Sequence, residues 1–390
     1  MNTSLVFTGD IGFDRFMDGK WEDENLISKD VLDFLHSGDH VIANVEGPLV
    51  SAPANTATEG AVQLMHTMNP GAVKVLKNMH ADIWNICNNH IMDAGEEGMK
   101  STLSYAASEG VTTLGAGMDI SEASKPVIIP EAGGIGLIGV GYRRGCRPAG
   151  PEKAGCFDWG DFDLIKARID EIKKTCRHCV IVSHGGEEFT ALPNPYTRDR
   201  YLKYLEMGAD IIVAHHPHVP MNFENVGDKA IFYSLGNFIF DTPYQRAQYN
   251  TEFGVLLRLD FTEEGFSFKA FGIKINRTAE HIEKCELPRI FADVPEKEYQ
   301  LLVPLSAKMF VEATKRQQIF MKNMSESSTE EEWAEHFANP KRSGRVPGEA
   351  LDFFEILPLA AKAEAGEWKK SRLEDIKAYI LEQMAPKGAV

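Results

Sequence analysis

Three histidines stand within four residues near the middle of the chain, in the segment His215-His216-Pro217-His218. The segment follows an apolar, strand-like run at residues 211–213. Packing rarely calls for three imidazoles together, whereas histidine is the commonest metal ligand in proteins. Two histidines separated by one residue can also face neighbouring metal ions. This segment therefore predicts a metal site.

Four further polar segments lie at the ends of other apolar runs. Each supplies a side chain suited to metal ligation or proton transfer, and these are Asp10, Glu46, Asn89 with His90, and His184. Taken singly, each has an ordinary explanation as a turn, a solvated carboxylate or a structural histidine. Together with the histidine segment they form a mixed oxygen and nitrogen ligand set, which suits Mn, Fe, Zn or Mg. Two carboxylates among several ligands favour a pair of divalent metal ions, which can clamp the attacking and leaving oxygens of a displacement at phosphorus.

Apolar runs alternate with amphipathic patterns over the first two thirds of the chain, which predicts an α/β fold. In such folds the carboxyl ends of strands form sites, so the polar segments are expected to converge there. Two later runs, 255–261 and 266–273, predict a β-hairpin. The strand-like runs are residues 5–7, 41–43, 83–86, 135–140, 180–182, 211–213 and 231–233, and the helical patterns are residues 28–36, 71–79, 96–108, 162–174 and 198–207.

The character of the sequence changes after about residue 287. Helical patterns near 299–320 and over 367–384 follow, with aromatic residues that give them apolar faces to bury. We therefore predict a catalytic domain at residues 1–287 and a helical C-terminal appendage at residues 288–390 that packs on it.

The composition restricts the classes of partner. The chain of 390 residues has a formal net charge of −16, and polyanion binding needs clustered lysine and arginine, so we expect no nucleic-acid partner. No apolar run is long enough to span a bilayer, and no basic leader precedes one. The expected location is cytoplasmic for the sequence as written, or extracytoplasmic if a leader has been removed. The oligomeric state stays open.

The polar segments, in this order, resemble the CapA family of poly-γ-glutamate capsule synthesis, a branch of the calcineurin-like metallophosphoesterases. The resemblance covers roughly residues 4–275 and implies a metallophosphoesterase-like, four-layer α/β/β/α sandwich built on two mixed sheets. The matching stretches are Gly9-Asp10 with Arg15, and residues 44–49, 88–98, 184–188, 208–218 and 233–238.

The resemblance also implies roles for single residues. Asp10 and His218 would hold one metal ion, Asn89, His184 and His216 would hold the other, and Glu46 would bridge them. His90 would act as the general acid and Arg15 would contact the substrate anion. The sequence departs from the wider superfamily at Gly12, where a histidine is usual, which leaves the first metal ion short of a ligand.

Two functions are compatible with these features. The first is a metal-dependent phosphoesterase that acts on a small or polymeric anionic phosphate ester. The second is a non-catalytic, metal-containing accessory protein of capsule polymer synthesis or export, whose cations bind carboxylates. A nuclease is disfavoured by the net charge of −16. Turnover of an aryl phosphate would separate the first two functions.

Overall fold

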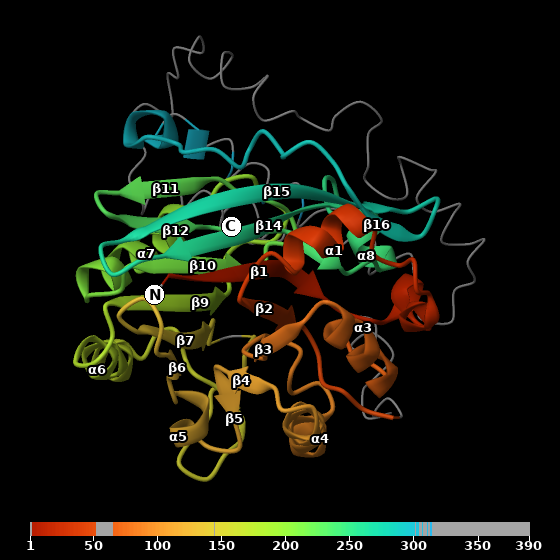
Figure 1. Ribbon diagram of the computed structural model, residues 1–390, viewed down its shortest axis with the longest axis horizontal. Helices are drawn as coiled ribbons and strands as arrows, with labels where there is room; N and C mark the ends of the chain where they lie inside the picture. Colours follow the sequence, from red (N-terminus) through yellow and green to blue (C-terminus); the bar gives the residue numbers. More distant parts are fainter. Residues whose placement is uncertain are drawn as a thin grey trace, which may run out of the picture.

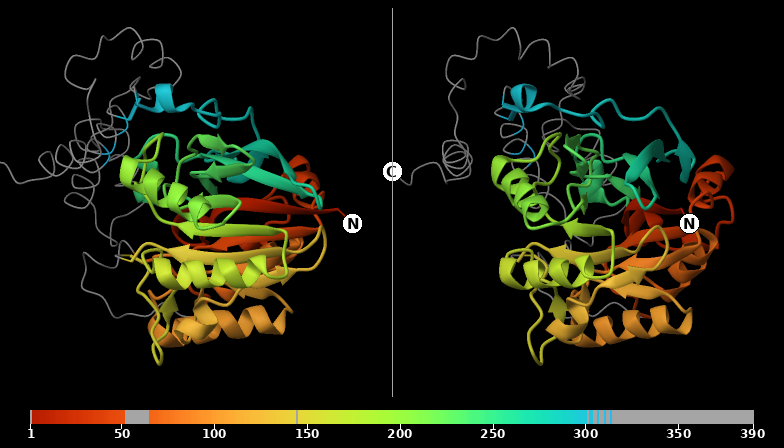
Figure 2. Two further views of the ribbon diagram at one scale, coloured as in Figure 1. Left: turned by 90° about the vertical axis from the view of Figure 1, so that its left-hand side faces the viewer. Right: turned by 60° about the vertical axis from the view of Figure 1, so that its left-hand side comes forward.

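The computed structural model describes residues 2–51, 65–143 and 145–300, and beyond these residues 302, 303, 306, 310 and 313. In this part of the chain two mixed β-sheets pack face to face, and helices cover both outer faces (Figures 1 and 2). The predicted four-layer α/β/β/α sandwich is confirmed. Most of the predicted appendage, residues 314–390, lies outside the described residues, so its helices and the boundary at residue 287 stay predictions.

The larger sheet joins a parallel half to an antiparallel half. Its strands lie in the order β16-β15-β14-β1-β2-β3-β4, and β13 pairs with the end of β1. Strands β1 to β4 run parallel because helical crossovers connect them, whereas β14 to β16 are joined by tight turns. The strands are β1 (Thr3–Ile11), β2 (His40–Val45), β3 (Ala81–Asn85), β4 (Thr112–Leu114), β13 (Asn237–Ile239), β14 (Phe253–Phe261), β15 (Phe266–Asn276) and β16 (His281–Lys284).

The smaller sheet has the strand order β11-β12-β10-β9-β7-β6. Its four inner strands are parallel, and an antiparallel strand lies at each edge. The strands are β6 (Val127–Ile129), β7 (Ile135–Gly141), β9 (His178–His184), β10 (Ile211–His215), β11 (Phe223–Val226) and β12 (Lys229–Phe232), and a separate ribbon pairs β5 (Ala116–Gly117) with β8 (Gly155–Cys156).

Apolar side chains from both sheets meet between them in one buried cluster that includes Phe7, Val182 and Val213. Burying each such side chain contributes about 1.5–3 kcal/mol, so this layer holds the two sheets together.

Helices α1, α3 and α4 cover the larger sheet, and α6 and α7 cover the smaller one. The helices are α1 (Lys29–Leu35), α3 (Val73–Asn78), α4 (Gly95–Ser108), α5 (Ile120–Ala123), α6 (Phe162–Lys173), α7 (Pro195–Glu206) and α8 (Pro243–Arg246), with short 3-10 turns η1 (Arg15–Met17), η2 (Lys20–Glu22) and η3 (Pro70–Ala72).

The helices and strands predicted between residues 5 and 233 are all present, with ends shifted by a few residues, and the hairpin forms as β14 and β15. The edge strands β4, β6, β11 and β16 and the short β13 were not predicted. They have three or four residues each, which is too few to show a clear alternation of apolar and polar side chains.

Strand β1 extends further than the sequence indicates, because β13 pairs with its last residues. Asp10 therefore lies inside the strand, and the prediction that it follows the strand is wrong. The pairing needs a close approach at Gly9, where an added Cβ atom would lie 2.2 Å from the Gly236 carbonyl oxygen. The neighbouring amide of Asp10 donates to the same oxygen at 2.9 Å. A glycine thus permits the contact that fixes the backbone of Asp10.

Tyr299 and Ser306 contact the loop that follows β9. The hydroxyl of Tyr299 donates to the Pro193 carbonyl at 3.0 Å, and the hydroxyl of Ser306 donates to the Leu192 carbonyl at 2.7 Å. These bonds fix the far end of the loop that begins at the end of β9.

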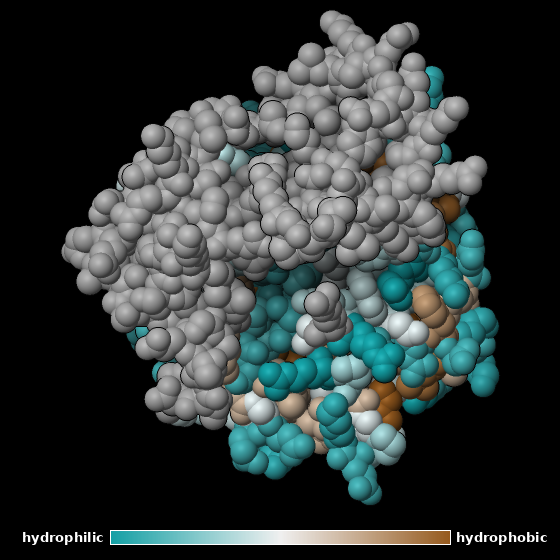
Figure 3. Space-filling view, turned by 180° about the vertical axis from the view of Figure 1, so that it is seen from behind, coloured by the Kyte–Doolittle hydropathy of each residue, from teal (hydrophilic) through white to brown (hydrophobic). Residues whose placement is uncertain are grey.

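Hydrophilic residues dominate the described surface. The described part of the face in Figure 3 is mainly hydrophilic, with hydrophobic residues scattered through it. Among the large hydrophobic side chains in the described part of the chain, only Ile128 (49%) and Leu287 (39%) are exposed, so this surface has no extended apolar patch for docking. Within the described residues, no helix combines the length and the apolar character needed to span a membrane.

Replacing Gly9 with alanine should lower the free energy of unfolding by about 1–3 kcal/mol, because β1 and β13 would have to separate to admit the Cβ atom. Urea denaturation measures this loss. Gly265→Ala is the matched control, since a Cβ atom there meets nothing within 4 Å. Equal losses in the two variants would contradict the interpretation.

Candidate metal centre

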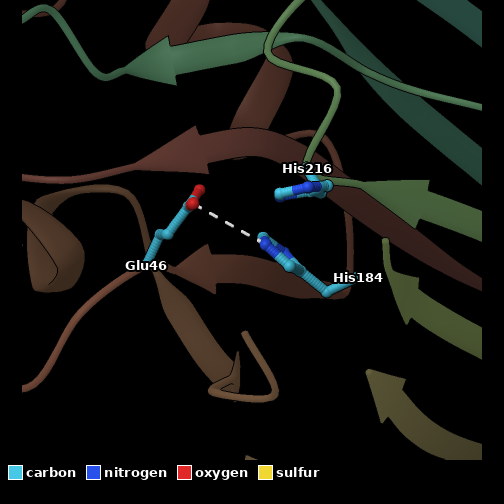
Figure 4. Close-up of side chains that lie close together, drawn as sticks. All are labelled: Glu46, His184 and His216. Carbon is cyan, nitrogen blue, oxygen red and sulfur yellow. Dashed lines mark ion pairs between the residues drawn. The ribbon is translucent and has the colours of Figure 1, made fainter. Parts of the chain in front are cut away.

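The six residues predicted as metal ligands meet at one end of the sandwich, at the carboxyl ends of strands from both sheets. Figure 4 shows three of them: Glu46, from the loop after β2, points toward His184, the last residue of β9, and toward His216, which follows β10. Asp10, Glu46, His184, His216 and His218 are almost completely buried, and Asn89 is half-buried.

The donor atoms form two overlapping groups. Asp10, Glu46 and His218 make the first, and Glu46, His184 and His216 make the second, with one ligand atom per residue and all such atoms within 4.8 Å of one another. Glu46 belongs to both groups, since its Oε1 lies 3.6 Å from His184 Nε2 and 3.7 Å from His218 Nε2. The geometry is that of two adjoining ligand sets that share a carboxylate.

Several buried polar atoms of the cluster have no hydrogen-bond partner among the described residues. They are both carboxylate oxygens of Glu46, Oδ2 of Asp10, and Nδ1 of His184, His215 and His216. A buried carboxylate without a partner costs several kcal/mol unless a compensating charge lies beside it. Oxygen and nitrogen donors around such a carboxylate suit Mn, Fe, Zn or Mg. The residues present therefore fit a divalent metal centre.

A row of amides orients Asp10. Asn44, its register partner on β2, donates from Nδ2 to Asp10 Oδ1 at 2.7 Å, and Asn85 on β3 donates to Asn44 Oδ1 at 2.7 Å. The second oxygen of Asp10 then faces His218, whose Nδ1 lies 3.1 Å away. The larger sheet thus presents one oxygen of this carboxylate to the cluster.

A second amide fixes the tautomer of His218. Asn237 donates from Nδ2 to Gln245 Oε1 at 3.1 Å and to the Thr251 carbonyl at 2.9 Å, so its Oδ1 is the atom that faces His218 Nδ1 at 3.0 Å. His218 Nδ1 must therefore carry a proton and donate it. Nε2 is left to face Glu46, which is the orientation that a metal-ligating histidine needs.

Backbone strain gathers at this end of the molecule. His216 and His218 have φ angles of 96° and 59°, and Arg15 and Phe189 have φ angles of 52° and 61°. Left-handed conformations cost a residue other than glycine about 1–3 kcal/mol and persist only where the surroundings impose them. The tight turn after β10 turns both His216 and His218 toward the cluster.

In the metal-free cluster, burial favours the neutral, metal-ligating form of two histidines, His184 and His216. Burial and the charge of His218 lower the pKa of His216 to about 3, and burial together with His216 lowers the pKa of His184. Burial and the charge of Asp10 raise the pKa of Glu46. Burial opposes the imidazolium of His218, but the charge of Glu46 and the contact with Asp10 raise its pKa to about 10. Burial also opposes ionisation of Asp10, but the imidazoles around it lower its pKa. The raised pKa values of Glu46 and His218 favour protonation of both groups while no cation is bound, and a cation beside them would lower both pKa values.

Asn89 and His90 lie beside the second group of donors. Asn89 Oδ1 is 2.8 Å from His184 Nε2, and its Nδ2 is 2.8 Å from His90 Nε2. His90 Nδ1 lies 2.7 Å from Asp93 Oδ2, so this carboxylate holds the ring with Nε2 toward the cluster. Burial and the charge of His66 lower the pKa of His90 to about 4.

A second carboxylate–histidine pair supports His90. His66 Nδ1 lies 2.6 Å from Asp14 Oδ2, its backbone amide donates to Asp93 at 2.8 Å, and its ring meets the ring of His90 at a centroid distance of 4.2 Å. Burial opposes ionisation of Asp14, but the charges of His66 and then Arg15 lower its pKa. The contact of Arg15 with a substrate anion stays a prediction.

Sequence reasoning assigned no role to several residues of the site. Glu188 is the last residue of the stretch 184–188, and Asn237 lies in the stretch 233–238. Both stretches resemble the family, but the sequence predicted no role for either residue. His66 and Asp14 gave no sequence signal, because neither stands in a recognised polar segment at the end of an apolar run.

Gly12 shows why the first donor group has only three members. A Cβ atom at this position would lie 2.6 Å from the ring of Phe240. That ring stacks on His218 at a centroid distance of 4.9 Å and also contacts His66 at 5.0 Å. An aromatic side chain therefore packs where a larger residue at position 12 would point.

Comparison with known proteins places this arrangement in a family. A family model described as "Bacterial capsule synthesis protein PGA_cap" matches residues 4–242, which include all six candidate ligands. The PGA biosynthesis protein CapA of Bacillus subtilis is 32% identical over 249 residues, covering 63% of this chain and 65% of that protein. The capsule biosynthesis protein CapA of Bacillus anthracis is 28% identical over 230 residues, covering 57% and 56%.

A probable polyglutamine synthesis accessory protein of Mycobacterium tuberculosis is 23% identical over 189 residues, covering 45% of this chain and 50% of that protein. The chain therefore spans less than two thirds of the length of these relatives.

Glu46→Gln should make the metal-free protein more stable at pH 8, by about 1–3 kcal/mol, because it removes a buried carboxyl group whose ionisation burial opposes and whose oxygens have no hydrogen-bond partner among the described residues. The pKa of Glu46 is higher in the folded state than its ordinary value of 4.5, so the folded state binds more protons and stability falls as pH rises above about 4.5. The variant lacks this decline. Urea unfolding in a chelating buffer between about pH 5 and pH 8 measures both profiles, and parallel profiles would contradict the prediction.

Proposed function

This chain belongs to the PGA_cap family of bacterial capsule synthesis proteins, a branch of the calcineurin-like phosphoesterase superfamily, and from this premise we propose that it is a metal-dependent phosphoesterase that acts in poly-γ-glutamate capsule metabolism. The observation that carries the proposal is the convergence of five other predicted ligands around Glu46, whose buried oxygens have no hydrogen-bond partner among the described residues.

The six residues divide between two cation positions. Asp10 and His218 would hold one ion, and His184, His216 and Asn89 would hold the other, with Glu46 between them. Two divalent cations in this place would lower the pKa of a water molecule and neutralise charge that develops at phosphorus. The amides of Asn44 and Asn237 would keep the ligands oriented in the absence of substrate.

The cluster offers an anionic substrate a local cationic site in an acidic protein. Two divalent cations would outweigh the charges of Asp10 and Glu46, although the whole chain carries a formal net charge of −16. This contrast suits a small or polymeric phosphate ester and disfavours nucleic acid, whose long backbone would meet the acidic surface.

His90 would pass a proton to the leaving oxygen. Asp93 holds Nδ1, so Nε2 is the atom that exchanges the proton. In this structure Nε2 faces the amide nitrogen of Asn89 at 2.8 Å, so the leaving oxygen must take the place of that amide as the partner of the ring. His66 and Asp14 support the ring from its other side.

The proposal is tested with the purified full chain, stripped by a chelator and reloaded with Mn²⁺, Fe²⁺, Zn²⁺ or Mg²⁺ in turn. An aryl phosphate monoester and a diester serve as substrates. We expect turnover that depends on the metal and falls by at least about 100-fold in Glu46→Gln and in His216→Ala, since cation binding supplies several kcal/mol of charge stabilisation. Because Glu46→Gln should fold at least as stably as the wild type, its loss of activity would not reflect unfolding.

His90→Asn should slow hydrolysis of an alkyl phosphate by about 10²–10⁴-fold while retaining the metal ions. The loss should be smaller for an aryl phosphate, whose leaving group needs less protonation. Metal content by elemental analysis and turnover of both esters provide the two measurements. Loss of metal from the variant, or an unchanged rate on the alkyl ester, would show that His90 has another role.

The alternative is a non-catalytic accessory protein whose cations bind the carboxylates of the polymer. The name of the Mycobacterium tuberculosis relative, an accessory protein, favours this reading. A metal-loaded chain that hydrolyses no phosphate ester but binds poly-γ-glutamate would establish it.

A further inference from the structure

A third group of donor atoms lies at the open side of the cluster. Glu188, His216 and His218 each bring a ligand atom within 4.8 Å of the others, and Glu188 Oε1 is 3.8 Å from His216 Nε2. The side chain of Glu188 is 28% exposed, whereas Asp10 and Glu46 are completely buried. Glu188 is therefore the carboxylate of the cluster that faces solvent.

Contacts hold Glu188 in this position. The hydroxyl of Tyr244 donates to its Oε2 at 3.0 Å, which leaves Oε1 toward the histidines. The next residue, Phe189, has a φ angle of 61°, and its amide donates to the Pro217 carbonyl at 2.9 Å. That bond ties the loop after β9 to the histidine loop after β10. The strained backbone thus directs the carboxylate toward the cluster.

The preceding glutamate provides a contrast. Glu187 is buried, its Oε2 accepts from the Asn194 amide at 2.9 Å, and its Oε1 accepts from the Thr197 hydroxyl at 2.8 Å. Both of its oxygens close the loop that leads into α7. Of the two adjacent glutamates, only Glu188 therefore keeps an oxygen available for a ligand.

We propose that Glu188 is a further metal ligand, which spans the two cation positions from the solvent side as Glu46 spans them from the buried side. The inference rests on the metal centre of the proposed function. His218 belongs to the first donor group and His216 to the second, so a carboxylate beside both can contact an ion in either position. Glu188 also adds a donor to the first group, which otherwise has three residues.

The test measures metal binding by the full chain in the absence of substrate. Wild type, Glu188→Gln and Glu97→Gln are stripped with a chelator and titrated with Mn²⁺ by calorimetry. Glu188→Gln should weaken the binding of at least one ion by at least about 10–100-fold, the range found when even an indirect partner of a metal site is removed. Glu97, an exposed residue of α4 that contacts only Lys100 among the contacts of the described residues, is the matched control and should bind as the wild type does.

Three further measurements separate ligation from a structural effect. The visible absorption of the Co²⁺-loaded protein should change in Glu188→Gln, because the spectrum follows the ligand set. Tyr244→Phe, which keeps the carboxylate but removes the hydroxyl that orients it, should weaken binding less. Urea unfolding in a chelator should give Glu188→Gln the stability of the wild type, and if that variant does not fold, Tyr244→Phe provides the test.

The outcomes distinguish this inference from the proposed function. Unchanged affinity, stoichiometry and Co²⁺ spectrum in Glu188→Gln, with a wild type that binds metal, would overturn the role of Glu188 alone. A wild type that binds no divalent ion would overturn the metal centre as well. The expected loss of affinity in a protein that hydrolyses no ester would support Glu188 as a ligand and contradict only the hydrolase.

Discussion

A buried carboxylate surrounded by imidazoles is the constraint on which the rest of the site depends. Glu46 Oε1 lies 3.6 Å from His184, 3.7 Å from His218 and 3.9 Å from His90, and neither of its oxygens has a hydrogen-bond partner among the described residues. Water cannot screen this charge, so only a proton or a bound cation can balance it at reasonable cost. The nearby histidines 184 and 216 are kept neutral by burial, which makes their nitrogens ligands instead of counter-ions.

The two sheets supply different kinds of donor atom to the candidate metal centre. The larger sheet supplies the oxygen donors Asp10, Glu46 and Asn89, and the smaller sheet supplies the nitrogen donors from the ends of β9 and β10. The apolar layer between the sheets sets their spacing, and the row of asparagines across β1, β2 and β3 sets the direction of Asp10. A cation shared between the groups would therefore join the two sheets at their ends, where the apolar layer stops.

The main strands and the candidate ligands at their ends could be predicted from the sequence. The parallel strands carry continuous apolar runs, so their ends and the polar residues beyond them stand out, as at His184 and His216. The extension of β1 past Asp10 could not be read, because it depends on pairing with β13, more than 220 residues away along the chain. The supporting residues were missed for a related reason. Asn237 and His66 act through hydrogen bonds to partners that are remote in sequence, and no local pattern records such a partner.

Contacts of Tyr299 and Ala313 connect the surroundings of the site to residues beyond the family match. Tyr299 holds the Pro193 carbonyl, and Ala313 packs in one apolar cluster with Phe189 and Tyr244, the neighbours of Glu188. The family model matches residues 4–242, so these contacts come from residues beyond that match. Substitutions at Tyr299 or Ala313 would therefore act on the loop that carries Glu188 without changing any residue of the family match. A comparison restricted to the matched residues would not detect such a change.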